Sequence, residues 1–387
     1  MNFSNFSNGC PPQIDSSQES ALKISALSVI GVFSLLGNLL TIAVVYREKS
    51  LHNTVNYLIV NMALSDLVTP LVIIPRFLVE VAQASSAWNI EGKTGVALCK
   101  LFYFTADLSP AVSILSLICI TTDRFCAIVF PLKTGVSQIA RARIFIVAAT
   151  WVVPILILAP YFYGFILVKT QTGQDLCVLR WSENGDDHLK VQYAFTTVMC
   201  VLFIIAPFIV LVIMYTLIMV RLWKQDRSAM ALSQSARERV MRYQKTKKVI
   251  YMALSIVVVF GICWGPYNAY IFTLTFVWEW KTSANFCGID IFLFVARFIA
   301  YSNPALNPII YFIFIERFRK GLRRIFAFES ARRKSEISSG RIFSDTGNRM
   351  SDNQSVPLTL IASRSLSRDL ARISPPHLKA RANSNRI

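Results

Sequence analysis

The chain has 387 residues, of which 54% are hydrophobic and only 16% are charged. Its formal net charge is +18 at pH 7 and its mean hydropathy is +0.49. Soluble domains carry about 25% charged residues, so these values exclude a chain of ordinary soluble domains and favour a protein that crosses a membrane several times.

The positions of the basic residues argue against a nucleic-acid-binding protein. Most of the 40 lysines and arginines lie in the odd-numbered loops and in the C-terminal tail. Lys and Arg gather in this way on the cytoplasmic side of membrane proteins. We therefore expect these loops and the tail to be cytoplasmic and the N-terminus to be extracellular, in a multi-pass protein of the plasma membrane.

Apolar segments long enough to cross a bilayer follow one another along the chain. Lipid offers backbone groups no hydrogen-bond partner, so each segment is expected to be an α-helix, and none shows the period-two alternation of a membrane strand. An amphipathic stretch, Ile315 to Phe328, follows and is expected to lie on the inner membrane surface. The expected fold is an all-α membrane protein, a seven-transmembrane helix bundle with a short amphipathic eighth helix. The seven segments cover residues 22–46, 55–82, 96–128, 143–167, 191–223, 247–277 and 286–312.

Composition divides the chain into three parts. Residues 1–21 are expected to form an extracellular tail, with glycosylation sequons at Asn2 and Asn5. Residues 22–328 form the membrane domain. Residues 329–387 are rich in Ser, Arg and Asn and poor in aromatic residues, so they are expected to form a disordered cytoplasmic tail that phosphorylation can switch.

Four of the eight cysteines fall on the expected outer side: Cys10, Cys99, Cys177 and Cys287. Four cysteines permit three pairings. We prefer Cys99 with Cys177, which ties a loop across the helix mouth, and Cys10 with Cys287, which closes the N-terminal tail onto the last outer loop.

An ionisable side chain within a span is costly and is read as functional by default. Asp66 lies in the middle of the second span, and Asn38, Ser113, Asn303 and Asn307 lie at comparable depth in other spans. A carboxylate among amides and a hydroxyl can hold a sodium ion or a proton. The alternative is a hydrogen-bonded packing network without an ion, and the two are compatible.

A series of short motifs runs in order through all seven spans and resembles the rhodopsin-like class of G-protein-coupled receptors. The resemblance covers residues 22–328. The motifs are Gly37-Asn38, Asp66, Cys99, Asp123-Arg124-Phe125, Trp151, Pro207, Tyr215, Phe260 with Cys263-Trp264-Gly265-Pro266, and Asn307-Pro308-Ile309-Ile310-Tyr311.

The resemblance implies roles for the matching residues. It implies that Asp123, Arg124, Tyr215 and Tyr311 contact a heterotrimeric G protein. It also implies that the core that repacks on activation consists of Ile114, Pro207 and Phe260. The residues that match the family's site for a sodium ion, an allosteric modulator, are Asp66, Ser113, Asn303 and Asn307. The ligand-binding residues expected from the outer halves of the spans are Arg76, Asp107, Trp264, Tyr267, Arg297 and Tyr301.

The expected partners follow from the same resemblance. They are an extracellular peptide ligand, a G protein, the lipid bilayer, and a receptor kinase and arrestin acting on the tail, where Arg332-Arg333-Lys334-Ser335 resembles a kinase site. We expect no cofactor, no nucleic acid and no enzymatic activity. The inner start of the sixth span, residues 245–248, lacks the acid that pairs with the arginine in some members. We therefore hypothesise basal activity, seen as signalling from ligand-free cells above that of untransfected cells.

The outer halves of the spans bear on the ligand. Amine receptors of the family place an aspartate where this chain has Ala106, and Asp107 is turned by about 100° around the helix. Arg76 and Arg297 can meet a carboxylate or an amide of a peptide, although Arg76 can also pair internally with Glu80. The disulfide expected between Cys10 and Cys287 and the stretches 127–133 and 316–320 look most like those of the neuropeptide receptors. The alternative is a receptor for a biogenic amine or another small ligand.

Pro110 lies about one turn beyond Asp107 and frees the carbonyl group of Ala106. We hypothesise that this proline sets the orientation of Asp107.

A membrane transporter is the main alternative of a different class. A transporter is expected to show repeated halves, and no such internal similarity is visible. An enzyme is less favoured because the three histidines are scattered over loops and tail and no nucleophile or metal constellation accompanies them.

Overall fold

The structure is a computed structural model that describes residues 15–129, 136–229, 234–280, 288–325 and 327. Its contacts separate a first unit, Met1–Ile325, from a second, Phe326–Ile387. The first unit holds seven helical segments that are long and apolar enough to cross a membrane, which confirms the predicted fold class. These segments are Ser17–Arg47, Thr54–Gln83, Gly92–Val129, Ile144–Gly164, Gly185–Leu222, Lys247–Phe276 and Ile289–Phe314.

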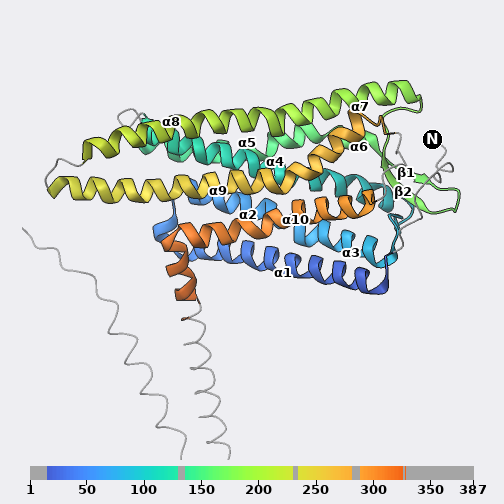
Figure 1. Ribbon diagram of the computed structural model, residues 1–387, viewed down its shortest axis with the longest axis horizontal. Helices are drawn as coiled ribbons and strands as arrows, with labels where there is room; N and C mark the ends of the chain where they lie inside the picture. The colour runs from blue at the N-terminus through green and yellow to red at the C-terminus, as the bar shows by residue number, and fades with distance from the viewer. Residues whose placement is uncertain (1–14, 130–135, 230–233, 281–287, 326, 328–387) are drawn as a thin grey trace, which may run out of the picture. The chain divides into compact units, whose positions relative to one another are not determined.

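The spans are built from the elements labelled in Figure 1. The second and fifth spans each consist of two α-helices joined by a short π-helix. In order, the elements are α1 (Ser17–Arg47), η1 (Lys49–Leu51), α2 (Thr54–Asp66), η2 (Thr69–Ile73), α3 (Ile74–Gln83), α4 (Gly92–Val129), α5 (Val136–Leu158), α6 (Tyr161–Gly164), β1 (Phe165–Lys169), β2 (Asp175–Leu179), α7 (Gly185–Cys200), η3 (Val201–Ile205), α8 (Ala206–Ala229), α9 (Gln234–Phe276) and α10 (Ile289–Phe314).

Side-chain caps define where several helices begin. Ser16 accepts from the backbone N–H of Glu19, and the Glu19 side chain accepts from the backbone of Ser16, so α1 starts with a complete capping box. Asn53 and Asn184 cap α2 and α7 through their side-chain oxygens. These caps satisfy backbone donors that would otherwise lack a partner at the ends of the spans.

Both π-helices lie beside prolines. Pro70 is within η2, and Pro207 lies two residues beyond the end of η3. Proline has no backbone N–H, so the regular i to i−4 ladder is interrupted there and the chain can take up the wider turn. The second and fifth spans therefore change their helical phase midway, which alters the side chains that they direct inward.

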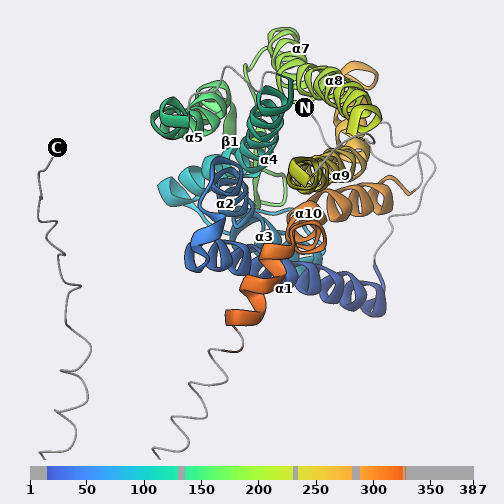
Figure 2. The same cartoon turned by 90° about the vertical axis from the view of Figure 1, so that its left-hand side faces the viewer.

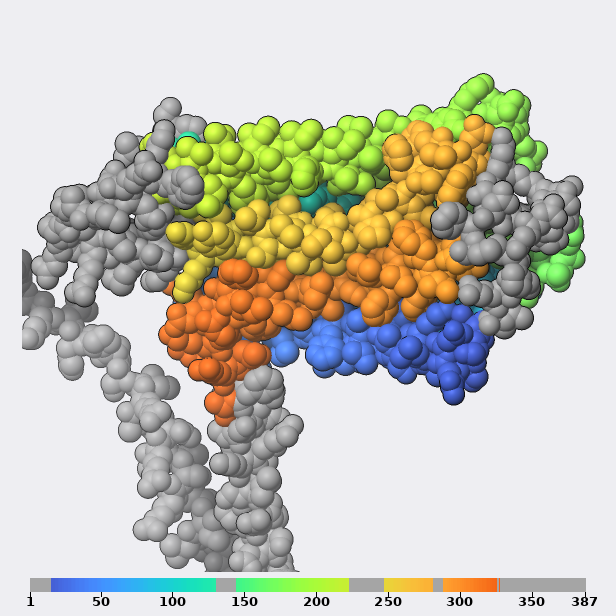
Figure 3. Space-filling model, viewed as in Figure 1, coloured from blue at the N-terminus to red at the C-terminus, as the bar shows by residue number. Residues whose placement is uncertain are grey.

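Helix α4 is the centre of the bundle. It packs against α2, α5 and α8, and the view along the bundle in Figure 2 shows it enclosed by them. On another face, the space-filling view shows α9 between α8 and α10 (Figure 3). One polar side chain joins three of these helices: Asn61 of α2 donates to the hydroxyl groups of Ser116 and Thr150 at 2.8 and 2.9 Å and accepts from the indole of Trp151 at 2.8 Å.

The fourth span ends earlier than predicted. We expected an apolar segment up to residue 167, but α5 ends at Leu158 and β1 begins at Phe165. Pro160 cannot donate to the helical ladder, and the residues after it form a short helix and then an antiparallel hairpin with β2. Hydropathy does not separate an apolar strand from an apolar helix, which explains the error.

A short helix follows the seventh span, as predicted. It covers residues 316–325 and runs across the direction of α10 in Figure 1, while Ile315 forms the non-helical junction. Phe318 is fully buried against Tyr311 and Phe312. Gly321 lies so close to α1 that a Cβ atom there would come within 2.8 Å of Val44. Only a glycine allows this approach, so the position of the short helix depends on it.

Candidate functional site

The outer end of the bundle is closed by a disulfide bond. Cys99 on α4 is bonded to Cys177 on β2, with 5.8 Å between their Cα atoms. This confirms the preferred pairing and holds the hairpin over the helix ends. The predicted pair of Cys10 and Cys287 and the sequons at Asn2 and Asn5 lie outside the described residues.

The two outer arginines share one carboxylate. Arg76 and Glu80 lie one turn apart on α3 and are 3.0 Å apart, while Arg297 reaches the other carboxylate oxygen of Glu80 from α10 at 3.4 Å. Arg76 also donates to the carbonyl groups of Ser86 and Ala87 and lies over the ring of Trp88. The internal pairing considered for Arg76 is therefore present, and Glu80 extends it to Arg297.

Asp107 is engaged by a phenol. The hydroxyl group of Tyr161 on α6 donates to its carboxylate at 2.6 Å. Among the described residues Asp107 has no ion-pair partner, in contrast to Glu80. Pro110 lies inside α4, which continues through it.

Aromatic rings form the base of this outer region. Trp264 of α9 meets Tyr267 edge to face at 6.3 Å and Tyr301 of α10 at 6.4 Å, measured between ring centroids. Tyr301 in turn meets Phe77 at 5.9 Å. The structure thus brings the predicted aromatic residues next to one another, between α3, α9 and α10.

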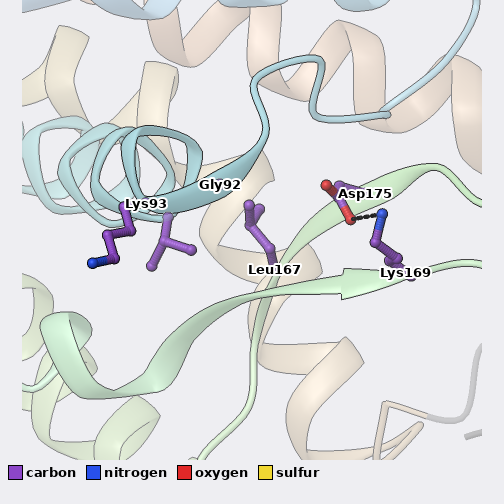
Figure 4. A pocket seen from close by; sticks show the side chains of 6 residues that line it. Gly92, Lys93, Leu167, Lys169 and Asp175 are labelled. Atoms are coloured by element: carbon purple, nitrogen blue, oxygen red, sulfur yellow. Dashed lines mark ion pairs between the residues drawn. The ribbon is translucent and has the colours of Figure 1, made fainter.

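A separate hollow of about 550 Å³ opens on the outer rim (Figure 4). Lys169 and Asp175, paired across β1 and β2, form an ion pair of 3.8 Å at one side of it, and the Lys169 side chain is 71% exposed. None of the residues predicted to bind ligand lines this hollow, so it is distinct from the predicted pocket. Its lining residues are Gly92, Lys93, Val96, Leu167, Lys169 and Asp175.

Asp66 lies at the centre of a buried polar cluster. One carboxylate oxygen accepts from Ser113 at 3.0 Å and the other from the amide of Asn307 at 2.8 Å. Asp66 is 1% exposed, and the amide of Asn38 nearby in the bundle bridges to the carbonyl group of Pro304 at 3.0 Å. The structure therefore joins α1, α2, α4 and α10 through polar side chains in the middle of the membrane domain.

Amide oxygens in this cluster have no donor. The Oδ1 atoms of Asn38, Asn303 and Asn307 are buried and have no hydrogen-bond partner among the described residues. Buried acceptors are normally satisfied, so each such atom calls for an explanation. Carboxylate, hydroxyl and amide oxygens are the ligands that hard cations prefer, and one carboxylate matches a single positive charge. The residues present therefore fit a sodium ion.

The predicted activation core is packed into the bundle beside the Asp66 cluster. Ile114 of α4 is 4% exposed and belongs to the inner hydrophobic core, against which Phe260 of α9 is packed. Phe260 lies 6.2 Å from Trp264, between ring centroids. Pro207 is buried at the start of α8. A continuous line of side chains thus connects the aromatic base of the outer region with the inner core.

At the inner end, the predicted coupling residues Asp123 and Arg124 pair with each other, and each of the two tyrosines contacts a different residue. Arg124 forms an ion pair with its neighbour Asp123 and donates to it through Nε at 2.9 Å. The hydroxyl groups of Tyr215 and Thr121 are 2.9 Å apart, and the hydroxyl group of Tyr311 lies 3.8 Å from the sulfur of Met62. Arg124 is thus bound to its own helix, and the two tyrosines are engaged elsewhere.

The short helix is tied to the loop after α1. Arg324 forms an ion pair with Glu48, and Arg317 donates to the carbonyl group of Ser50 at 2.7 Å. The hydrogen bond from Ser50 and the guanidinium of Arg324 lower the pKa of Glu48. These contacts fix the short helix beside α1.

Three residues that matter here were not singled out from the sequence, and a fourth was considered with only one of its two partners. Glu80 was considered only for Arg76, and Tyr161 and Thr121 were not considered as partners of Asp107 and Tyr215 because such contacts depend on helix packing. Asn61 could have been found, since it is a polar residue within an apolar run, the same argument that singled out Asp66.

Comparison with known proteins shows related membrane proteins. The sequence model described as 7 transmembrane receptor (rhodopsin family) matches residues 37–311. Neuropeptide receptor 22 of Caenorhabditis elegans is 29% identical over 296 residues, which are 76% of the chain and 67% of that receptor. The neuromedin-K receptor of Homo sapiens is 28% identical over 312 residues, 79% of the chain and 62% of the receptor.

A third relative, the tachykinin-like peptides receptor 99D of Drosophila melanogaster, is 26% identical over 75% of the chain and 54% of the receptor. The chain thus spans between about half and two thirds of the length of these relatives. The family match covers well over half of the chain and reaches from within the first to within the seventh helical span of the described structure. The chain belongs to the rhodopsin family of seven-transmembrane receptors.

Proposed function

We propose that the chain is a plasma-membrane receptor for an extracellular peptide and that it activates a heterotrimeric G protein. The ion pair of Arg124 with Asp123 carries the proposal, because it holds on its own helix the arginine that the family uses to meet the G protein. The names of the relatives, which include receptors for neuropeptides and tachykinin-like peptides, support a peptide as the ligand.

The proposed mechanism is a two-state equilibrium of the bundle. In one state Arg124 is held by Asp123, and in the other it is free to meet the G protein after α9 moves outward. A ligand shifts this equilibrium only by binding one state better than the other. A shift from 1:99 to 99:1 requires an affinity ratio of about 10⁴, so the pocket must change its contacts substantially between the two states.

The line of side chains from Trp264 through Phe260 to the inner core offers a route for this coupling. Packed cores have discrete arrangements, because close-packed side chains cannot deform continuously. A change at Trp264 therefore has to be taken up by repacking of Phe260 against Ile114.

A sodium ion held by Asp66, Ser113, Asn303 and Asn307 would act as an allosteric modulator of this equilibrium. The ion would supply the positive charge that the buried carboxylate lacks. The unpartnered oxygens of the asparagines support this part of the proposal. A receptor kinase and arrestin acting on the C-terminal tail would end the signal.

Nucleotide exchange on a G protein tests the proposal directly. Membranes from cells that express the chain are screened with a library of peptides and amines, and exchange on purified G proteins is measured. We expect at least one peptide to stimulate exchange. The Arg124→Ala variant should bind the same peptide and lose the stimulation, while the exposed Arg323→Ala variant, a matched control, should keep it. Uptake of a solute without any nucleotide exchange would instead identify a transporter, and activation by amines alone would favour the small-ligand alternative.

A further inference from the structure

Four charged side chains of the outer region divide into two groups with opposite net charge. Arg76 and Arg297 share the single carboxylate of Glu80, which leaves one positive charge in excess. Asp107 has a phenol as its partner and no cation among the described residues. The first group therefore lacks an anion and the second lacks a cation.

The negative group is well suited to receive a positive charge. A buried carboxylate is costly unless it is paired, and a neutral phenol supplies a hydrogen bond but no compensating charge. Tyr161 donates to one oxygen of Asp107 at 2.6 Å, so the other lone pairs stay available. A cationic group placed there would gain a charge-assisted hydrogen bond.

In the positive group, Arg297 is the arginine with spare capacity. Arg76 is held on several sides, by Glu80 at 3.0 Å, by two backbone carbonyl groups and by the ring of Trp88. Arg297 has a longer ion pair of 3.4 Å to Glu80, lies over Phe77 and keeps 32% of its side chain exposed. A guanidinium has five N–H donors in a planar fork that matches a carboxylate.

Tyrosine rings lie beside each of the two groups. Tyr103 lies one turn before Asp107 on α4, and Tyr301 lies one turn beyond Arg297 on α10. Tyr301 also meets Trp264 edge to face. A ligand long enough to cover the rings on both sides can reach both groups.

We propose that this receptor recognises a dipolar peptide, whose cationic group pairs with Asp107 and whose carboxylate pairs with Arg297. The inference rests on the proposed peptide receptor and specifies its ligand. The cation is a basic side chain or a free N-terminal amine, and the anion is a free C-terminal carboxylate or an acidic side chain. An aromatic or apolar residue between them covers the tyrosine rings. A simple amine would satisfy only Asp107.

The test uses synthetic peptides that have one arginine, one aromatic residue and a free C-terminal carboxylate. Each peptide that stimulates nucleotide exchange is remade with citrulline in place of arginine, with a C-terminal amide, and with both changes. Removing one member of a buried charge pair costs 2 kcal/mol or more, so each single change should lower potency by about 30-fold or more. Equal potency of the charged and neutral forms would overturn the inference and leave the proposed receptor function standing.

Receptor variants test which residue recognises each charge of the peptide. In the Asp107→Asn variant, arginine and citrulline forms should become equally potent, while the preference for the carboxylate remains. In Arg297→Gln, the carboxylate and amide forms should become equally potent, while the preference for arginine over citrulline remains. Glu183→Gln and Arg180→Gln, which change exposed charges of the outer loop, are the matched controls and should keep both preferences. An unchanged arginine preference in Asp107→Asn contradicts the assignment of the cation.

Surface expression of every variant is measured with an antibody to an N-terminal tag. If Asp107→Asn fails to reach the surface, the peptide series on the unaltered receptor still decides the inference. Failure of every peptide to stimulate exchange would count against the proposed function itself, so the two failures are distinguishable.

Discussion

Asp66 and Asp107 both lie in membrane spans, and neither has an ion-pair partner among the residues that the structure describes. Their neighbours differ. Asp66 accepts from a hydroxyl and an amide, and amide oxygens without donors lie in the same cluster. Asp107 accepts from one phenol, and a second tyrosine, Tyr103, lies one turn before it on the same helix. The same residue type is thus placed in an oxygen-rich site that suits an inorganic cation and in an aromatic site that suits an organic one.

This difference predicts that the two aspartates respond to different cations. Replacing sodium by potassium at constant ionic strength should raise agonist affinity in the unaltered receptor by about fivefold or more, the range of typical allosteric coupling. Asp66→Asn should lose this response. Asp107→Asn should keep it while losing about 30-fold in potency toward the arginine-containing peptides.

The measurement is radioligand displacement in sodium and potassium buffers, with both variants at equal surface expression. Loss of the sodium response in both variants would show that the two sites are not independent. The comparison between the two aspartates would then fail.

The partner of Asp107 offers a second test. Tyr161→Phe removes the donor from a buried carboxylate, and an unsatisfied buried group costs about 1–3 kcal/mol. We expect the purified ligand-free receptor to unfold at a lower temperature and a dipolar peptide to restore more stability to this variant than to the unaltered protein. Tyr163→Phe changes a residue that is 73% exposed and serves as the control. Equal melting temperatures for the two variants would show that the phenol does not support Asp107.

The hypothesis about Pro110 sharpens the same comparison. Pro110→Ala supplies the N–H that can bond to the carbonyl group of Ala106 and regularises α4 next to Asp107. If the proline orients Asp107, potency of the arginine-containing peptides should fall severalfold, whereas the sodium response at Asp66 should stay. An unchanged potency would remove Pro110 from the account of the pocket.

Glu48 is an acid whose basic partner, Arg324, is exposed, and it should show the smallest effect. Its pKa is lowered by the Ser50 hydrogen bond and by Arg324, so its stabilising contribution is present above the ordinary carboxylate pKa and is lost as the pH falls through the lowered value. Exposed pairs contribute little. Glu48→Gln should therefore lower the melting temperature only slightly at pH 7, and the difference from the unaltered protein should disappear below the lowered pKa of Glu48. A large decrease at pH 7 would mean that this tether supports the whole bundle.

Much of the fold could be predicted from hydropathy alone. The seven spans were placed correctly because each apolar run is longer than a bilayer requires, and Asp66 was found because a carboxylate stands out within such a run. The end of the fourth span was wrong because Phe165–Lys169 is apolar and forms a strand. The outer topology left three pairings of the four cysteines open, and the preferred pairing of Cys99 with Cys177, which ties a loop across the helix mouth, was predicted correctly.

Contacts across the bundle could not be predicted. The sequence shows that Arg76 and Glu80 are one turn apart, but not that Arg297 reaches the same carboxylate from α10. The contact depends on how α3 and α10 are rotated about their axes, and η2 changes the phase of the second span before Arg76 is reached. Hydrophobic periodicity does not determine such rotations closely enough to pair individual side chains.

By itself, the sequence determined the number of spans and the charged residues within them, because apolar length and the cost of burying charge are properties of the chain. Only the tertiary structure decided the partner of each charge. It joined Asp66 to Ser113 and Asn307, Asp107 to Tyr161 and both outer arginines to Glu80. Those partners bear on function, because neighbours that do not neutralise a buried charge leave it to be neutralised by a ligand or an ion.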